Sequence, residues 1–380
     1  KRLTPMAKAG IAAGLVALLG GTWWLAQRGR VVAHDPVSVL VADFTNSADP
    51  VYSGTVEQAL TIGIEGATFV TALPHRDAVR VAGEIKAGSK IDDKTAPLVA
   101  KREGVPIIIG GSITPKGTGV SIGVKAVQVA DQKVLLDWST TAASKDEVLS
   151  AVGRAAERVR RTLGDTTTGD SGAQETFTAG SLEAAKAYAE AQELVWAGKN
   201  DDAIIAYQKT LTIDPEFGRA HAGLAAIYAN RGKTDDAEAN YRKALARLDR
   251  MTEREKLRTR TGYYLFTKDY ERAAEEARTL LAKFPGDTSA MANLAFAQFG
   301  RRDMKSALEM GRKASDAYPN NILRKNNAAL FAMYAGDFDE SIRLGRDVLN
   351  LNPKFEKAFI AIGVSQLATG RASDAAATFD

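Results

Sequence analysis

A 34-residue spacing constrains the second half of this 380-residue chain more than any other feature. Prolines recur at that spacing, at Pro285, Pro319 and Pro353, and Pro215 lies 70 residues before the first of them, which is two periods plus two inserted residues. Small residues mark a second position of the same phase, at Ala203, Ala237, Ala273, Ala307, Ser341 and Ala375. A period of this length indicates stacked units, because each unit must bury its apolar side against the next.

This pattern is that of the tetratricopeptide repeat, a pair of antiparallel helices with a small residue at position 20, an aromatic residue at 24 and proline at 32. Tyr207 and Tyr241 supply the aromatic residue in the first two repeats. Glycines where the first helix of a pair must end occur at Gly198, Gly232, Gly336 and Gly370. We therefore predict an all-α solenoid over residues 181–380, capped at Ser181, with five repeats and a sixth that is truncated at Asp380. We expect the natural chain to continue, because a solenoid needs a capped end.

The first helices of such pairs line a concave surface, which is where we expect a protein or peptide to bind. The first helices of the fourth and fifth repeats supply the candidate binding residues, and Asn293 and Asn327 occupy equivalent positions. The candidates are Asn293, Phe296, Phe299, Asn326, Asn327 and Leu330. The alternative interpretation is that the asparagines are ordinary repeat residues and the apolar side chains fill the core, since apolar residues at helical spacing commonly do so.

Residues 36–164 alternate between strand and helix patterns. The apolar run Val37 to Phe44 predicts a buried strand, and three later runs joined by turn sequences predict an antiparallel meander. Those runs are Pro106 to Thr114, Gly119 to Val129 and Lys133 to Thr141. The order predicts a small mixed α/β domain with helices packed on one sheet. Residues 165–180, rich in Thr, Gly and Ser, predict a flexible linker to the repeats.

Near the start, the uncharged run Ala9 to Ala26 follows a juxtamembrane segment, residues 1–8. Eighteen residues at about 1.5 Å each give a helix of roughly 27 Å, close to the thickness of a bilayer core. Trp23 and Trp24 lie where an aromatic belt would be. We predict a transmembrane helix, with a cleaved signal peptide and a buried helix as the alternatives. The flanking charges do not determine its orientation.

Composition excludes several classes of function. Fifty basic and 46 acidic residues give a net charge of +4, which does not favour nucleic-acid binding. The chain has no cysteine, and its three histidines lie far apart, so we expect no metal site and no cofactor. His75-Arg76-Asp77 imitates a kinase catalytic loop, but Ala82 stands where that loop needs Asn. We expect no catalytic residues.

Two stretches resemble known families. The sequences VLVADFTNSADPVYSGTVEQAL and IIIGGSITPKGTGVSIGVKAVQV resemble the amino-terminal domain of the Tol-Pal β-propeller protein (TolB-like). SLEAAKAYAEA and the insertion RMTEREKLRTRTGYY resemble the carboxyl-terminal halves of bacterial receptor-type serine/threonine kinases. In those proteins a cytoplasmic kinase precedes one membrane helix, a TolB-like domain and tetratricopeptide repeats. The kinase domain itself is absent here.

The resemblance implies a single-pass protein of the bacterial inner membrane, with the residues after about 30 in the periplasm. Our leading hypothesis is a non-catalytic sensing or protein-binding region that couples binding outside the cytoplasm to a cytoplasmic output, such as the kinase, with self-association as one route. The alternatives are an envelope assembly or scaffold protein without a signalling head, and the receptor part of a winged-helix regulator or nucleotide cyclase.

Overall fold

The computed structural model of the chain describes residues 35–166 and 179–380. The predicted membrane helix, the segment before it and most of the predicted linker lie outside these residues. Among the helices that are described, none is both long and apolar enough to cross a bilayer.

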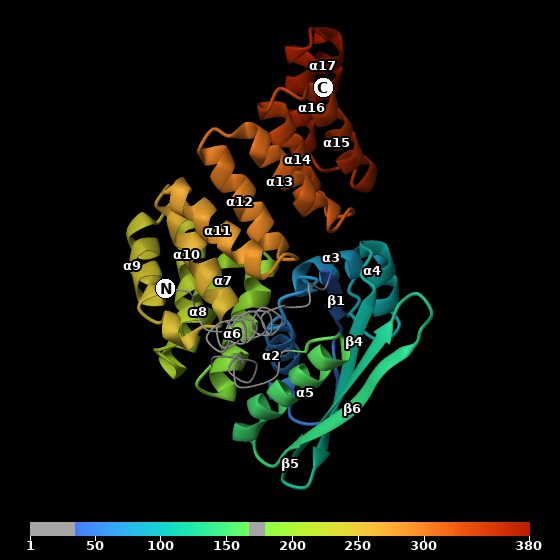
Figure 1. The fold of residues 1–380 in the computed structure, drawn as a ribbon, viewed down its shortest axis with the longest axis vertical. Helices are drawn as coiled ribbons and strands as arrows, with labels where there is room; N and C mark the ends of the chain where they lie inside the picture. The colour runs from blue at the N-terminus through green and yellow to red at the C-terminus, as the bar shows by residue number, and fades with distance from the viewer. Residues whose placement is uncertain (1–34, 167–178) are drawn as a thin grey trace, which may run out of the picture. The chain divides into compact units, whose positions relative to one another are not determined.

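Residues 37–162 form the predicted mixed α/β domain (Figure 1). Its strands are β1 (Val37–Val41), β2 (Thr45–Asn46), β3 (Val70–Ala72), β4 (Ile107–Lys116), β5 (Gly119–Gln128) and β6 (Val134–Ala142). Its α-helices are α2 (Thr55–Ile64), α3 (His75–Ile85), α4 (Ala96–Glu103) and α5 (Val148–Thr162), and two short 3₁₀ helices, η1 (Pro50–Tyr52) and η2 (Lys145–Glu147), complete it.

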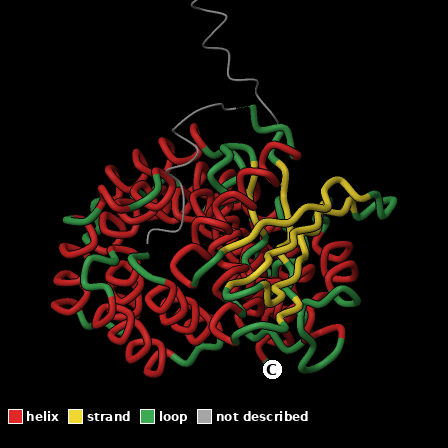
Figure 2. Tube along the Cα trace, turned by 90° about the horizontal axis from the view of Figure 1, so that it is seen from below, coloured by secondary structure: helices red, strands yellow, loops and turns green. Residues whose placement is uncertain are grey.

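The strands form one twisted sheet, drawn in yellow in Figure 2. Their order is β3-β1-β4-β5-β6, and β2 pairs with β4. Strand β1 runs parallel to both β3 and β4, with Val39 opposite Ala72 on one side and Ile107 on the other. Strands β4, β5 and β6 pair antiparallel, so the predicted meander is confirmed. Strand β5, the middle strand of the meander, buries its alternate residues Val120, Ile122, Val124 and Ala126, as its sequence predicted.

Helices cover both faces of the sheet. On one face α2 and α5 bury Val39, Ile109 and Ile122, and on the other α3 and α4 bury Leu40 and Ile108. The alternation of side chains along each strand sends neighbouring residues into these two separate cores. Strand β1 therefore buries apolar residues on both faces, as is typical of a strand in a parallel region.

Residues 182–379 form six helix pairs, as the 34-residue period predicted. These pairs are α6 (Leu182–Trp196) with α7 (Asn200–Ile213), α8 (Gly218–Asn230) with α9 (Thr234–Leu245), α10 (Glu253–Phe266) with α11 (Tyr270–Lys283), α12 (Thr288–Gly300) with α13 (Met304–Asp316), α14 (Ile322–Tyr334) with α15 (Phe338–Leu351), and α16 (Lys357–Ala368) with α17 (Ala372–Phe379). A 3₁₀ turn, η3 (Leu248–Arg250), lies in the insertion before α10. Ser181 caps α6 by accepting a hydrogen bond from the amide of Ala184, as predicted.

The repeat positions behave as their chemistry requires. The small residues at position 20, among them Ala203 and Ala307, are fully buried, so the two helices of a pair can approach closely. The four glycines that were expected to end first helices all have positive φ, between 70° and 78°. In the third and fourth pairs, Lys268 and Arg302 take up that left-handed conformation without glycine.

The α/β domain packs against the first helices of the repeats. Apolar residues of α2 and α5 share one core with Leu182, Tyr188 and Phe217 of the first two repeats. A charged docking cluster, formed by Glu65, Arg254, Arg258 and Asp287, lies further along the contact. Arg254 donates to the backbone oxygen of Val70 at 3.1 Å, and its Nη1 lies 3.1 Å from Glu65 Oε1.

Arg258 completes the docking cluster. Its Nη2 donates to Asp287 Oδ2 at 2.7 Å, and its Nη1 lies 3.7 Å from Glu65 Oε2. Asp287 is fully buried and caps α12 by accepting from the amide of Ala290. Burial by itself would raise the pKa of Asp287, but the two arginines outweigh burial and hold it below its usual value. Helix α10 thus places two arginines where they bind the α/β domain.

Candidate functional site

The six residues predicted to line a concave surface lie on α12 and α14. Phe296 and Asn327 are exposed, Asn293, Phe299 and Leu330 are half-buried, and Asn326 is buried with only 4% of its surface accessible. Phe296 and Leu330 occupy equivalent positions one period apart, and the same step leads to Val364 on α16. The candidate surface therefore continues into a helix that sequence reasoning had not included.

Aromatic side chains connect α12 to α14. The Phe299 ring lies 5.8 Å from that of Phe331 and 5.0 Å, edge-on, from that of Tyr334. The Phe296 ring stacks against it at 6.4 Å. Sequence reasoning missed Phe331 and Tyr334. Their spacing from Leu330 on the same helix was visible in the sequence, but exposure depends on which neighbours cover them.

We call the exposed part of this surface the apolar face. Its members are between 39% and 55% exposed: Phe296, Leu323, Tyr334, Ile360, Val364 and Leu367. All six lie on first helices, α12, α14 or α16, and none of these three helices contains an aspartate or glutamate. Arg324, Lys325 and Lys357 are their only charged residues. Several exposed apolar side chains on neighbouring helices commonly mark an interaction site.

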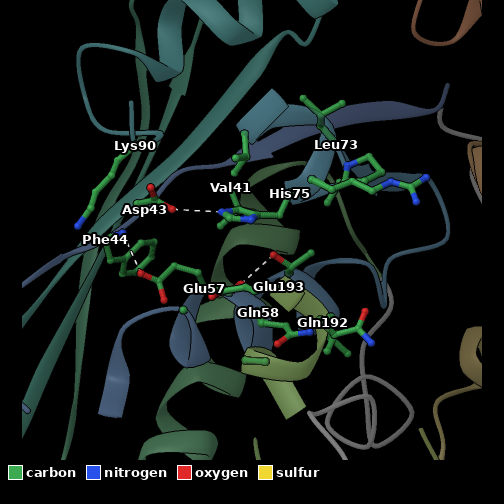
Figure 3. Close-up of a pocket in the computed structure, with 18 of the residues that line it drawn as sticks. Val41, Asp43, Phe44, Glu57, Gln58, Leu73, His75, Lys90, Gln192 and Glu193 are labelled. Atoms are coloured by element: carbon green, nitrogen blue, oxygen red, sulfur yellow. Dashed lines mark hydrogen bonds and ion pairs between the residues drawn. The ribbon is translucent and has the colours of Figure 1, made fainter. Parts of the chain in front are cut away.

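The corresponding surface of the earlier repeats faces the α/β domain across a crevice of about 1180 Å³ (Figure 3). One wall consists of the carboxyl ends of β1 and β3 with the starts of α2 and α3. The other consists of first helices of the repeats, including Gln192 and Glu193 of α6, Arg219 of α8 and Arg258 of α10. Ligands of parallel sheets commonly bind at the carboxyl ends of the strands.

An aspartate and a histidine meet inside the crevice. Asp43 follows β1, His75 follows β3, and Asp43 Oδ1 lies 3.2 Å from His75 Nε2. The other Asp43 oxygen accepts from the amide of Ile91 at 2.8 Å. Burial alone would raise the pKa of Asp43, yet the hydrogen bonds from His75 and Ile91 prevail and lower it. His75 therefore orients an aspartate, and its neighbour Asp77 is buried on another side of α3.

Glu57 of α2 lies beside this pair. Its Oε1 accepts from the amide of Phe44 at 2.9 Å, whereas its Oε2 is buried and has no hydrogen-bond partner. The residue is 8% exposed. Burial raises the pKa of Glu57 to about 7, against the hydrogen bond from Phe44. Nothing in the sequence marked this glutamate, because its burial depends on how α2 packs.

The described residues contain no cluster of three or more His, Cys, Asp or Glu side chains that could hold a metal ion. The crevice is thus lined by both apolar and polar side chains, and its polar groups include an aspartate–histidine pair and an incompletely bonded carboxyl group. These groups can bind or exchange protons with a ligand.

Comparison with known proteins identifies the repeats. The family model for the tetratricopeptide repeat matches residues 188–250 and 263–322. A search of curated proteins found no match. The findings concern the repeats, so the resemblance to receptor-type kinases and to the TolB-like domain stays a proposal.

Similar solved structures include chains of repeat proteins. One is the Cut9–Hcn1 hetero-tetramer of the APC/C, at 20% identity and a TM-score of 0.44 over 51% of this chain and 38% of that one. Others are PilF of Pseudomonas aeruginosa, at 20% identity and 0.40 over 52% and 89%, and PilW, a type IV pilus biogenesis factor, at 16% and 0.44 over 52% and 90%. Scores this low carry no argument about partners. The chain contains a solenoid of tetratricopeptide repeats beside a small mixed α/β domain.

Proposed function

We propose that this chain is a non-catalytic protein-binding scaffold that holds an apolar segment of a partner protein on its apolar face. The observation that supports this proposal is the set of exposed apolar side chains on α12, α14 and α16, which share one side of the repeats. Tetratricopeptide repeats commonly present such a surface to peptides. Apolar side chains that are about half exposed leave apolar surface in water, and a bound segment that covers this surface gains free energy.

The charges indicate what kind of segment fits. Lys325 and Lys357 lie on helices that carry no acidic residue, so a partner with carboxylates beside its apolar residues is complementary. The partner class is therefore an apolar segment with acidic flanks. A basic segment of the same apolar content meets like charges.

Fluorescence anisotropy with labelled synthetic peptides tests this proposal. We expect an apolar peptide with glutamate flanks to bind the full chain, and the same peptide with lysine flanks to bind at least tenfold more weakly. Replacing both Phe296 and Tyr334 with Ala should weaken binding of the first peptide by at least tenfold, since buried aromatic residues dominate such interfaces. Ile205→Ala is the matched control, because Ile205 is 65% exposed but lies on the second helix α7. Equal binding by all three proteins would refute the assignment.

We also propose that Ala9–Ala26 tethers this scaffold to the bacterial inner membrane, with the repeats in the periplasm. The uncharged run of membrane length supports the tether, while the periplasmic side and the coupling to a cytoplasmic kinase rest on resemblance. An envelope scaffold without a signalling head needs the same tether. Protease treatment of spheroplasts tests the topology: digestion of the repeats is expected, and their protection until lysis would contradict it.

A further inference from the structure

A tyrosine of the repeats enters the core of the α/β domain. Tyr318 follows α13, is only 1% exposed, and belongs to the apolar core that α3 and α4 form with the sheet. Two residues further on, the side chain of Asn320 donates a hydrogen bond to the backbone oxygen of Arg102 in α4. We call Tyr318 and Asn320 the anchor. It lies beyond the docking cluster, at the junction of the fourth and fifth repeats.

Glu103, the last residue of α4, is buried beside the anchor. It directly follows Arg102, whose oxygen binds Asn320, and its charge contributes to raising the pKa of Tyr318. The residue is 1% exposed, and neither of its carboxyl oxygens has a hydrogen-bond partner. A carboxyl group that lacks both water and hydrogen-bond donors is much less stable as an anion than in its protonated form.

The charges on α3 and α4 do not compensate for this burial. Arg80 and Arg102 favour the ionised form of Glu103, whereas Asp77 and Glu84 disfavour it. Both arginines are already bound to Glu84, at 2.7 and 2.6 Å. Burial therefore prevails and raises the pKa of Glu103 above its ordinary value.

The groups that the repeats bring to this contact do not neutralise Glu103 either. Tyr318 stays uncharged, because burial raises the pKa of its hydroxyl group. The guanidinium group of Arg324 lies 4.9 Å from the centre of the Tyr318 ring, and the charge of Asp77 acts on it. Arg324 is itself only 8% exposed, and its Nη1 has no hydrogen-bond partner. The anchor thus holds a carboxyl group in a place where its anion is poorly solvated.

We propose that the anchor is a proton-dependent latch, which is engaged while Glu103 is protonated and is released when Glu103 ionises. Withdrawal of Tyr318 from α3 and α4 gives Glu103 access to water, so the ionised form favours the released state. The anchor is the end that opens, because at the other end the α/β domain and the first repeats share one apolar core. Release lets the repeats beyond the anchor move relative to the α/β domain. This device goes beyond the proposed binding function and does not depend on it.

The direction of the pH dependence follows from the raised pKa. The contribution of Glu103 to docking is fully present below pH 4.5, the ordinary pKa of a glutamate side chain, and is lost as the pH rises through the higher value of the docked state. Acid therefore engages the latch, and a neutral or alkaline solution loosens it.

A distance between two spin labels on the full chain tests the latch. The chain has no cysteine, so Ala87→Cys, in the exposed turn after α3, and Ser373→Cys, on an exposed position of α17, each take one label. Double electron–electron resonance should show one short distance at pH 4.5 and an additional longer distance at pH 8. We expect the ratio of engaged to released molecules to fall roughly tenfold over this range. An unchanged distance distribution at the two pH values would overturn the proposal.

Variants in the labelled chain identify the groups responsible. Glu103→Gln cannot ionise, so it should keep the short distance at both pH values. Glu309→Gln, on an exposed side chain of α13, is the matched control and should respond to pH as the parent does. Tyr318→Ala should show the longer distance already at pH 4.5, and it decides the matter if Glu103→Gln does not fold. The proposal is wrong if Glu103→Gln responds to pH like the parent, or if Tyr318→Ala keeps the short distance.

Discussion

Replacing Arg254 with Met should weaken the docking of the α/β domain on the repeats. The guanidinium group of Arg254 donates to the Val70 oxygen at 3.1 Å, lies 3.1 Å from Glu65, and stacks 4.3 Å above the ring of Phe284. Its side chain is only 4% exposed. Methionine keeps much of the stem but loses every donor, so Glu65 and the Val70 oxygen stay buried without this partner.

Removing one partner of a buried ion pair costs about 3–5 kcal/mol. We expect a value near the lower limit, about 3 kcal/mol, because Arg258 remains 3.7 Å from Glu65 and 2.7 Å from Asp287. That loss corresponds to a decrease of roughly a hundredfold in the equilibrium constant for docking. Urea unfolding followed by circular dichroism measures it, and the single transition of the parent chain should split into two if docking is what joins the parts.

Arg260→Met is the matched control on the same helix. Arg260 is 40% exposed and lies 3.9 Å from Glu276, so its loss should cost under about 1 kcal/mol. A double-mutant cycle of Arg254→Met and Glu65→Gln measures the interaction free energy between the two side chains. We expect a value of about 1–3 kcal/mol. If Arg254→Met is no more destabilising than the control, or the coupling is zero, our account of the docking cluster is refuted.

Two further predictions concern stability. The pKa of Glu57 is raised from 4.5 to about 7 in the folded chain, so the stability that this group contributes is fully present below pH 4.5 and is lost as the pH rises through 7. The parent should lose about 3 kcal/mol of unfolding free energy relative to Glu57→Gln as the pH rises from 4.5 to 8. Denaturant titrations of both proteins at several pH values measure this difference. Stability curves that run parallel across this range would contradict the prediction. Gly336→Ala should destabilise the fifth repeat by about 1–2 kcal/mol, because Gly336 has a φ of 78°; thermal melting with Gly83→Ala as control checks it, since a Cβ at Gly83 meets open space.

The local features of the fold could be predicted from the sequence. The geometry of a single repeat requires a helix end at Gly198 and Gly370 and a small residue at Ala203. These requirements are visible as short patterns in the sequence. Lys268 and Arg302 show the limit of such patterns. They adopt the same positive φ without glycine, because the helices on either side fix the turn.

Contacts between distant segments could not be predicted. Glu65 and Arg254 are separated by most of the α/β domain and two repeats, and no periodicity relates them. The sequence showed two inserted residues in the period and a resemblance near α10, but neither indicated that Arg254 and Arg258 of this helix form the docking contact. The meander was predictable from its turns, whereas the parallel pairing of β1 with β3 and β4 depends on the crossover helices.

The candidate sites could likewise be predicted only in part from the sequence. Of the predicted binding residues, Phe296 is half exposed whereas Asn326 is buried. The exposure of each position depends on the neighbouring repeat. Asp43, Glu57 and His75 come together only when β1, α2 and β3 are assembled, so each of them alone looked unremarkable in sequence.

The wide separation between Val70 and Arg254 has a consequence for biosynthesis. The backbone oxygen of Val70 leaves the ribosome 184 residues before the arginine that binds it. At roughly 5–20 residues per second, the α/β domain waits about 10 to 40 s for its partner. During that interval the edge of β3 and the Glu65 side of α2 are open to other chains. The nascent protein is then most exposed to edge pairing and to chaperones, and translation as far as α10 ends that exposure.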